Sequence, residues 1–179
     1  MTFFEALAEQ RWDDHRYYHH NRVNQSLHLV SALAFLAAYG LLFVAPAAAV
    51  LLAWLVAMPA RQIGHFFFEP HDYDAVNQAT HAHKEAIKVG YNLQRKVVLL
   101  SIWLLAPLPL LIDTTLGGGI EPPADWMGVA NRVAMVWLVI GVGAVLFRTV
   151  QLFFVRDVRT GVVWLSKILT DPFHDIMLY

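Results

Sequence analysis

The stretch "LLAWLVAMPARQIGHFFFEPHDYD", from Leu51 to Asp74, changes its chemical character near its middle. Its first ten residues carry no charge and have the composition of the end of a membrane-spanning helix. The 14 residues that follow include two His, one Glu and two Asp. Ionisable groups at a membrane boundary are costly to place and commonly serve a function. The stretch therefore predicts a helix that leaves the membrane directly into a polar site.

The composition of the whole chain supports a membrane protein. Of its 179 residues, 58% are hydrophobic and 15% are charged, and the mean hydropathy is +0.47, whereas a soluble domain has about 25% charged residues. We predict an all-α, polytopic integral-membrane protein in which residues 1–179 form a single domain. The net charge of -1, without a basic stripe, argues against a nucleic-acid partner. The absence of Cys excludes disulfides and thiolate metal ligands.

Long apolar runs predict about four transmembrane helices. A single crossing needs roughly 20 residues, and the runs cover residues 27–45, 46–60, 97–112 and 133–155. No charged residue separates the first two runs, so we expect a tight helical hairpin that turns near Pro46. Pro107 and Pro109 are expected to kink or end the third helix. Near the C-terminus, Thr170 or Asp171 is expected to cap a short helix that begins at Pro172.

The distribution of Lys and Arg predicts the orientation of the spans. Three lie before the first apolar run, five lie between residues 61 and 96, and four follow from Arg148 onward. Residues 113–131 contain none. By the positive-inside rule, the N-terminal surface helix, the segment 61–96 and the C-terminus are expected to be cytosolic. The membrane would be a bacterial inner membrane or the endoplasmic reticulum.

Eight of the nine His residues lie in the first half of the chain, in three clusters. In the first, "DDHRYYHHNRVNQSLH", helical spacing places His20, Asn24 and His28 on one face, with His15 and His19 on a neighbouring one. The other clusters each contain a His and a Glu four residues apart, which also share a helix face. These pairs are His65 with Glu69 and His81 with Glu85.

Imidazole and carboxylate groups together suit Fe, Zn or Mn. The clusters therefore predict a metal site at the membrane surface, in preference to a set of solvated interfacial side chains. The spacing alone assigns no role to four further His residues. These are His15, His71, His83 and His174.

Two of these stretches resemble a known family, the small membrane 2-hydroxy-fatty-acid dioxygenases. "YYHHNRVNQSLH" resembles their motif Tyr-His-x-x-x-x-Asn-x-x-x-His, and "RQIGHFFFE" resembles their motif Gln-x-Ile-Gly-His-x-x-x-Glu. The likeness covers residues 12–70. Arg22 stands where a proline is usual, and "PHDYDAVNQATHAHKE" replaces the Pro-Ala that usually follows the Glu motif. The matching positions are Tyr18, His19, Asn24 and His28 in the first motif and Gln62, Gly64, His65 and Glu69 in the second.

The resemblance implies an Fe(2+)-dependent enzyme of fatty-acid α-oxidation that uses dioxygen to shorten a 2-hydroxy fatty acid by one carbon. The family motif selects His19 as a ligand, whereas helical geometry groups His20 with His28, and the sequence leaves both open. The expected metal ligands are His19 or His20, His28, His65 and His81. Glu69 is expected to be a further ligand or a carboxylate that contacts one of the ligands. His28, His65 and Glu69 are the expected catalytic residues, and Asn24, Arg61 and Lys84 the expected substrate-binding ones.

Three other functions remain compatible with the sequence. A diiron hydroxylase or desaturase would use most of the clustered His residues. A haem-binding electron-transfer protein would use His pairs as axial ligands. A non-catalytic membrane scaffold would carry the same His residues at the membrane interface. The sequence does not predict the oligomeric state.

Overall fold

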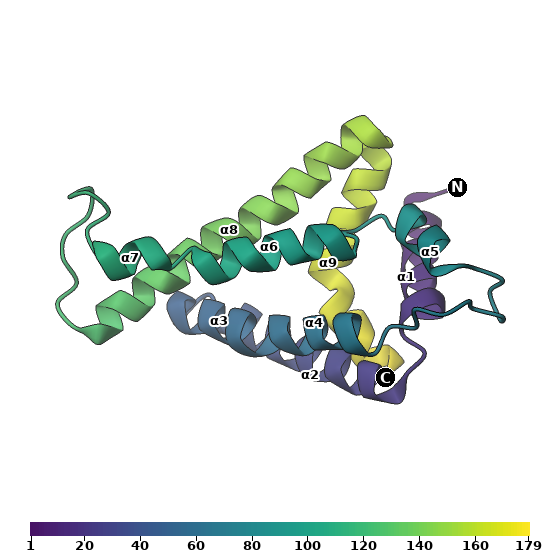
Figure 1. The fold of residues 1–179 in the computed structure, drawn as a ribbon, viewed down its shortest axis with the longest axis horizontal. Coiled ribbons are helices and arrows are strands. Elements are labelled where there is room, and N and C mark those ends of the chain that lie inside the picture. The colour runs from purple at the N-terminus through teal and green to yellow at the C-terminus, as the bar shows by residue number, and fades with distance from the viewer.

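The computed structural model describes residues 1–179 as helices joined by turns and loops (Figure 1). Its only β-type pairing is one isolated bridge between Asp74 and Ala79, so the prediction of an all-α fold is confirmed. The helices are α1 Phe3–Tyr18, α2 Arg22–Leu41, α3 Pro46–Leu52, the π-helix η1 Ala53–Ala57, α4 Met58–Phe67, α5 His81–Ile87, α6 Leu93–Leu105, α7 Leu108–Ile112, α8 Trp126–Val155 and α9 Val158–Leu178.

Three helical segments are long and apolar enough to cross a membrane. They are Pro46–Phe67, Leu93–Ile112 and Trp126–Val155. The first of these includes polar residues that follow residue 60, the predicted end of the span. The helix does not end there but continues through η1 and α4 to Phe67. The predicted span at 27–45 falls largely in α2, which is not among the three because its N-terminal half is polar. Its crossing of the membrane stays a prediction.

Proline residues set the helix boundaries much as the sequence predicts. α2 ends at Leu41 and α3 begins at Pro46, where the missing N–H and fixed φ suit the first helical position. The hairpin therefore turns where expected, and α2 packs against α3, η1 and α4. In the next predicted span the helix is interrupted at Pro107, between α6 and α7.

The prediction for the C-terminal segment is wrong. Pro172 does not begin a short helix but lies inside α9, which is capped much earlier by the Asp157 side chain on Thr160 N. Proline in a helix interior removes one backbone hydrogen bond. Packing of α9 against α1, α2 and α8 provides the contacts that hold the helix through this position.

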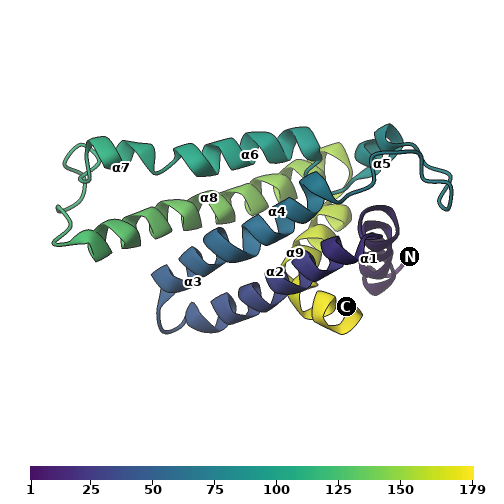
Figure 2. The same cartoon turned by 60° about the horizontal axis from the view of Figure 1, so that its bottom comes forward.

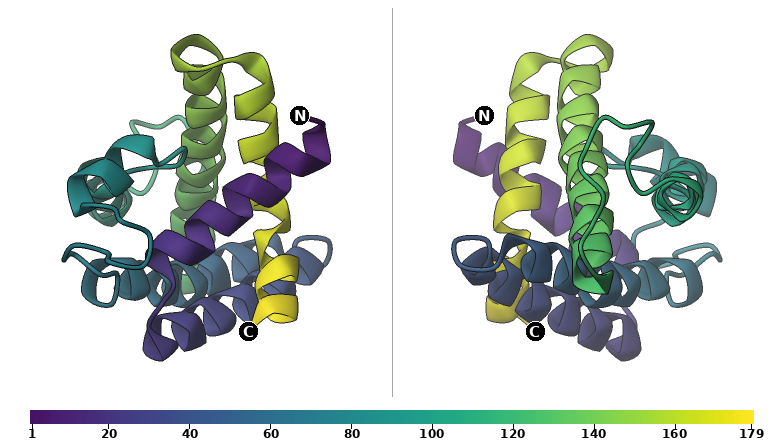
Figure 3. Two further views of the ribbon diagram at one scale, coloured as in Figure 1. Left: turned by 90° about the vertical axis from the view of Figure 1, so that its right-hand side faces the viewer. Right: turned by 90° about the vertical axis from the view of Figure 1, so that its left-hand side faces the viewer.

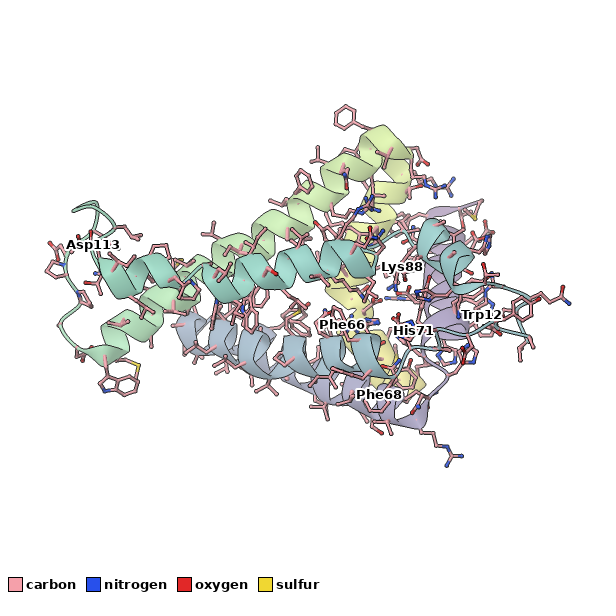
Figure 4. All side chains as sticks on the ribbon, viewed as in Figure 1. Trp12, Phe66, Phe68, His71, Lys88 and Asp113 are labelled. Atoms are coloured by element: carbon pink, nitrogen blue, oxygen red, sulfur yellow. The ribbon has the colours of Figure 1, made fainter.

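Polar segments that are distant in sequence gather at one end of the molecule. Figures 1 and 2 show α8, α6 and the hairpin α2–α4 running alongside one another, with α1, α5 and α9 at a common end. The loop that contains Asp113 lies at the opposite end (Figure 4). Figure 3 shows α1 lying across the end of the bundle next to α9, which it contacts. The His-rich segments can therefore meet at this end of the molecule.

Candidate metal centre

Three His side chains converge at this end of the bundle. One ring nitrogen from each of His19, His28 and His65 lies within 4.8 Å of the others. The His19 and His28 residues are 6% and 1% exposed, and the His65 side chain is 12% exposed. The ring centroids are 4.0 Å apart for His19 and His28 and 4.9 Å apart for His28 and His65. We refer to these three residues as the His triad.

A break between α1 and α2 decides which His of the first cluster joins the triad. α1 ends at Tyr18 with His19 as its C-cap, and the Asn21 side chain caps α2 through Val23 N. The predicted helical face of His20, Asn24 and His28 is therefore wrong, because His20 lies outside the helix. His19 is left free to turn toward His28. The structure groups His19, which the sequence motif selects, and not His20 with His28 and His65.

Close packing of α2 against α4 brings His28 and His65 together. Gly64 lies directly against Asn24 and His28, and a Cβ at this position would clash with Asn24 Oδ1. The Asn24 amide donates a hydrogen bond to the Tyr18 carbonyl oxygen at 2.9 Å. Asn24 is fully buried and lines neither cavity of the site. It therefore holds the helix break in place, whereas the sequence predicted that it would bind substrate.

Two of the triad rings are oriented by a contact of their Nδ1 atom with another side chain. His65 Nδ1 donates to Glu69 Oε1 one turn further along the chain, which leaves His65 Nε2 free. Lys88 Nζ in turn lies 3.5 Å from the Glu69 carboxylate. His19 Nδ1 lies 2.8 Å from the Tyr179 hydroxyl. A carboxylate or hydroxyl partner on the far nitrogen fixes the tautomer and the direction of a metal-binding imidazole.

The unpaired nitrogens of the triad fit a metal ion. His19 Nε2 and both ring nitrogens of His28 are buried without a hydrogen-bond partner. Buried polar atoms without partners are costly, and a metal ion would satisfy them. Burial lowers the pKa of His19 to about 3, against an opposing effect of Asp14, so this ring is neutral and has a lone pair to offer. Three imidazoles suit several transition metals and leave coordination positions open.

The structure does not bring two of the predicted ligands to the triad. His20 is exposed, and its Nε2 contacts the Arg16 carbonyl oxygen and lies 3.9 Å from Asp74. His81 instead packs against His71, with ring centroids 4.8 Å apart. His20 lies in the connection between α1 and α2, and His81 is the first residue of α5, so both lie outside the α2–α4 hairpin.

The predicted substrate-binding residues Lys84 and Arg61 have different positions. Lys84 is fully buried, its Nζ donates to the Pro70 carbonyl oxygen at 3.2 Å, and its own carbonyl accepts from Tyr18. It lines neither cavity, so it stabilises the loop instead. Arg61 lines both cavities but is paired with Asp175 at 2.5 Å.

The sequence analysis missed the contribution of α9. A small polar cavity of about 30 Å³ adjoins the triad, and α9 supplies much of its lining. Lys167 Nζ is 2.5 Å from Asp14 and 2.6 Å from Asp171, and this contact joins α9 to α1. Burial would raise the pKa of Asp14, but Lys167 outweighs it and lowers that pKa to about 2. The signal was available as polar residues at every fourth position: Lys167, Asp171, Asp175 and Tyr179.

A much larger, mostly apolar cavity has His65 in its lining. Its volume is about 660 Å³, within the range of roughly 300–1,000 Å³ typical of ligand sites. It lies among α1, α2, the α3–α4 segment, the α5–α6 connection, α6, α8 and α9, and 26 of its 38 lining residues are hydrophobic. From His65 it extends past Trp54 to Val50. At about 1.5 Å per residue, the helical segment from Trp54 to His65 is roughly 16 Å long.

The protein is thus helical, and three of its helical segments are long and apolar enough to cross a membrane. It has a three-His candidate metal centre beside an apolar cavity. Residues 6–80 match the family model described as 2-hydroxy-palmitic acid dioxygenase Mpo1-like. This match confirms the resemblance predicted from the two motifs. It covers less than half of the chain and includes the whole His triad and Glu69, but none of α6, α8 and α9. No curated protein and no solved structure matches the chain.

Proposed function

We propose that this protein is a membrane-embedded, Fe(2+)-dependent dioxygenase that shortens 2-hydroxy fatty acids by one carbon. The observation that carries the proposal is the position of His65, which belongs to the His triad and also lines the large apolar cavity. A metal-binding group therefore borders a space suited to an acyl chain. The name of the matching family supports the reaction and the substrate class.

The proposed roles of the side chains follow from their contacts. His19, His28 and His65 would hold the ion, while Glu69 and Tyr179 keep two of the rings in position. Iron would supply the dioxygen chemistry when bound, and the protein supplies orientation and exclusion of water. The apolar walls of the cavity would hold the acyl tail, with the polar head of the substrate beside His65.

We also infer a four-span topology in which α2 crosses the membrane together with the three apolar segments. Support comes from the antiparallel packing of α2 against α4 and from the loop around Asp113 at the end opposite to α1 and α5. With the positive-inside rule, the His triad would lie at the cytosolic face. A fatty acid can reach such a site from the membrane, since its tail stays in an apolar environment.

The test uses protein purified without oxygen, with bound metals measured by mass spectrometry and turnover measured on 2-hydroxypalmitate with dioxygen. The wild type is expected to contain stoichiometric iron and to release the acid shortened by one carbon. His28→Ala and His65→Ala are expected to lose both properties. His83→Ala is the matched control, since His83 is exposed and outside the triad. Full metal content and full turnover in both triad variants would contradict the proposal.

The same measurements distinguish the other functions. A diiron enzyme would contain two irons for each chain, although the structure groups only three His residues. A haem protein would show a Soret band, and a scaffold would contain no stoichiometric metal. A mononuclear, colourless iron site with product formation would exclude all three.

A further inference from the structure

Four cationic side chains line the large cavity, and three of them already have an acidic partner. Arg61 pairs with Asp175 at 2.5 Å. Lys88 and Lys167 each pair with two carboxylates. Lys88 lies near Glu85 (3.2 Å) and Glu69 (3.5 Å), and Lys167 near Asp14 (2.5 Å) and Asp171 (2.6 Å). Their charges are neutralised within the protein.

Lys96 is the fourth cation, and it differs from the others. Its side chain lines the cavity but makes no ion pair and no side-chain hydrogen bond within the protein. It is half-buried, whereas the adjacent Arg95 is exposed and does not line the cavity. A cation in an apolar surrounding is costly unless it is paired. The cavity therefore offers one positive charge without an internal counter-ion.

Lys96 lies on the face of α6 that also contributes apolar residues to the cavity. Leu99 and Leu100 follow three and four residues later, on the same helix face, and both line the cavity. On the opposite wall, His65 is followed toward the interior by Met58 and Trp54. Both walls thus change from polar to apolar in the same direction. A molecule with an anionic head and a long apolar tail matches this pattern.

We propose that Lys96 binds the carboxylate of the fatty-acid substrate and places its head group beside His65. The inference deepens the proposed function and rests on it, since it names a residue that recognises the acid group. It replaces Lys84, whose ammonium is bound to the Pro70 carbonyl oxygen, and it supplements Arg61, which Asp175 neutralises. Lys96 acts in binding and takes no part in the chemistry.

The experiment measures fatty-acid binding to the purified full-length protein in detergent, by displacement of a fluorescent fatty acid. Lys96→Met is expected to bind 2-hydroxypalmitate about 10- to 100-fold more weakly, because a charge-assisted interaction is lost. Lys96→Arg keeps the charge and is expected to bind nearly as well as the wild type. Arg95→Met, which changes a neighbouring exposed cation, is expected to leave binding unchanged. Equal thermal unfolding and metal content of the variants show that the fold is retained.

A second ligand separates recognition of the carboxylate from contact with the tail. Hexadecanol has the tail without the acid, so wild type and Lys96→Met are expected to bind it equally. In turnover, Lys96→Met is expected to raise KM with little change in kcat. Wild-type binding of 2-hydroxypalmitate by Lys96→Met would overturn the role of Lys96 and leave the dioxygenase proposal intact. Lys96-dependent binding without product formation would instead support the carboxylate site and contradict the proposed reaction.

Discussion

At the scale of single residues, the candidate metal centre consists of the three His rings and of the side chains that hold two of these rings in position. The sequence motif identified His19, His28, His65 and Glu69, and the structure groups the three His residues and places Glu69 on His65. Tyr179 could not be assigned in the same way, because its contact with His19 joins positions 160 residues apart. Local spacing reports only on neighbours along one helix.

Glu69→Gln tests whether the carboxylate acts through His65. The amide can still accept the Nδ1–H bond but lacks the charge that raises the basicity of the ring, so metal affinity is expected to fall about 10- to 100-fold. The measurement is competition with a calibrated chelator. Glu121→Gln, an exposed change in the loop at the opposite end, is the control. If Glu69→Gln retains wild-type affinity, the His65–Glu69 contact has only a structural role.

At the scale of elements, prolines and apolar runs predicted the hairpin and the division of α6 from α7. They did not predict two other features of the helices. The helix that contains His65 continues past its apolar part, because α4 is held against α2 by the close contact at Gly64. α9 continues through Pro172 because it packs against α1, α2 and α8. In both cases tertiary packing outweighs a local signal that would end a helix.

Gly141 of α8 tests whether the π-helix η1 shapes the apolar cavity. The Trp54 ring of η1 lines the cavity, stacks on Trp103 with centroids 5.8 Å apart and covers Gly141. A Cβ at Gly141 would lie 2.9 Å from Trp54 Cζ2, so the ring must move. Gly141→Ala is therefore expected to lower kcat/KM on 2-hydroxypalmitate more than on 2-hydroxyoctanoate, whose short tail ends before Trp54.

The control for this prediction lies in the same helix. Gly143→Ala places a methyl group where no other atom lies within 4 Å, so it is expected to leave the chain-length preference unchanged. A change in the helix interior from Gly to Ala also favours the helix by about 1 kcal/mol. Equal behaviour of the two variants on both substrates would show that Trp54 does not limit the cavity.

At the scale of the whole molecule, the site is assembled from the two ends of the sequence. The family match ends at residue 80, but the large cavity needs α6, α8 and α9 for its walls, and the small one needs α9. Composition and charge predicted that the polar segments would share one end of the bundle. They could not predict that α9 lies across it, since pairs such as Lys167 with Asp14 connect the termini.

The absence of Cys from the natural sequence makes the topology directly testable with single introduced cysteines. If α2 crosses the membrane, the turn between α2 and α3 lies on the same side as the loop around Glu121. Phe43 in this turn is 89% exposed, so Phe43→Cys offers an accessible thiol. In intact cells, an impermeant thiol reagent is expected to label Phe43→Cys and Glu121→Cys. His83 is an exposed residue of α5, and His83→Cys is expected to react only after the membrane is permeabilised.

The labelling pattern also separates four spans from two spans with a re-entrant hairpin. Should neither α2 nor the α3–α4 segment cross, the turn at Phe43 would stay within the membrane or on the cytosolic side. Its thiol would then be protected in intact cells while that of Glu121→Cys still reacted. Such a result would leave His19 and His65 at one face but would make the hairpin re-entrant. Labelling of His83→Cys in intact cells would reverse the orientation altogether, because α5 lies at the same end as the His triad. A cytosolic metal centre therefore requires the expected results for His83→Cys and Glu121→Cys, and the four-span topology also requires labelling of Phe43→Cys.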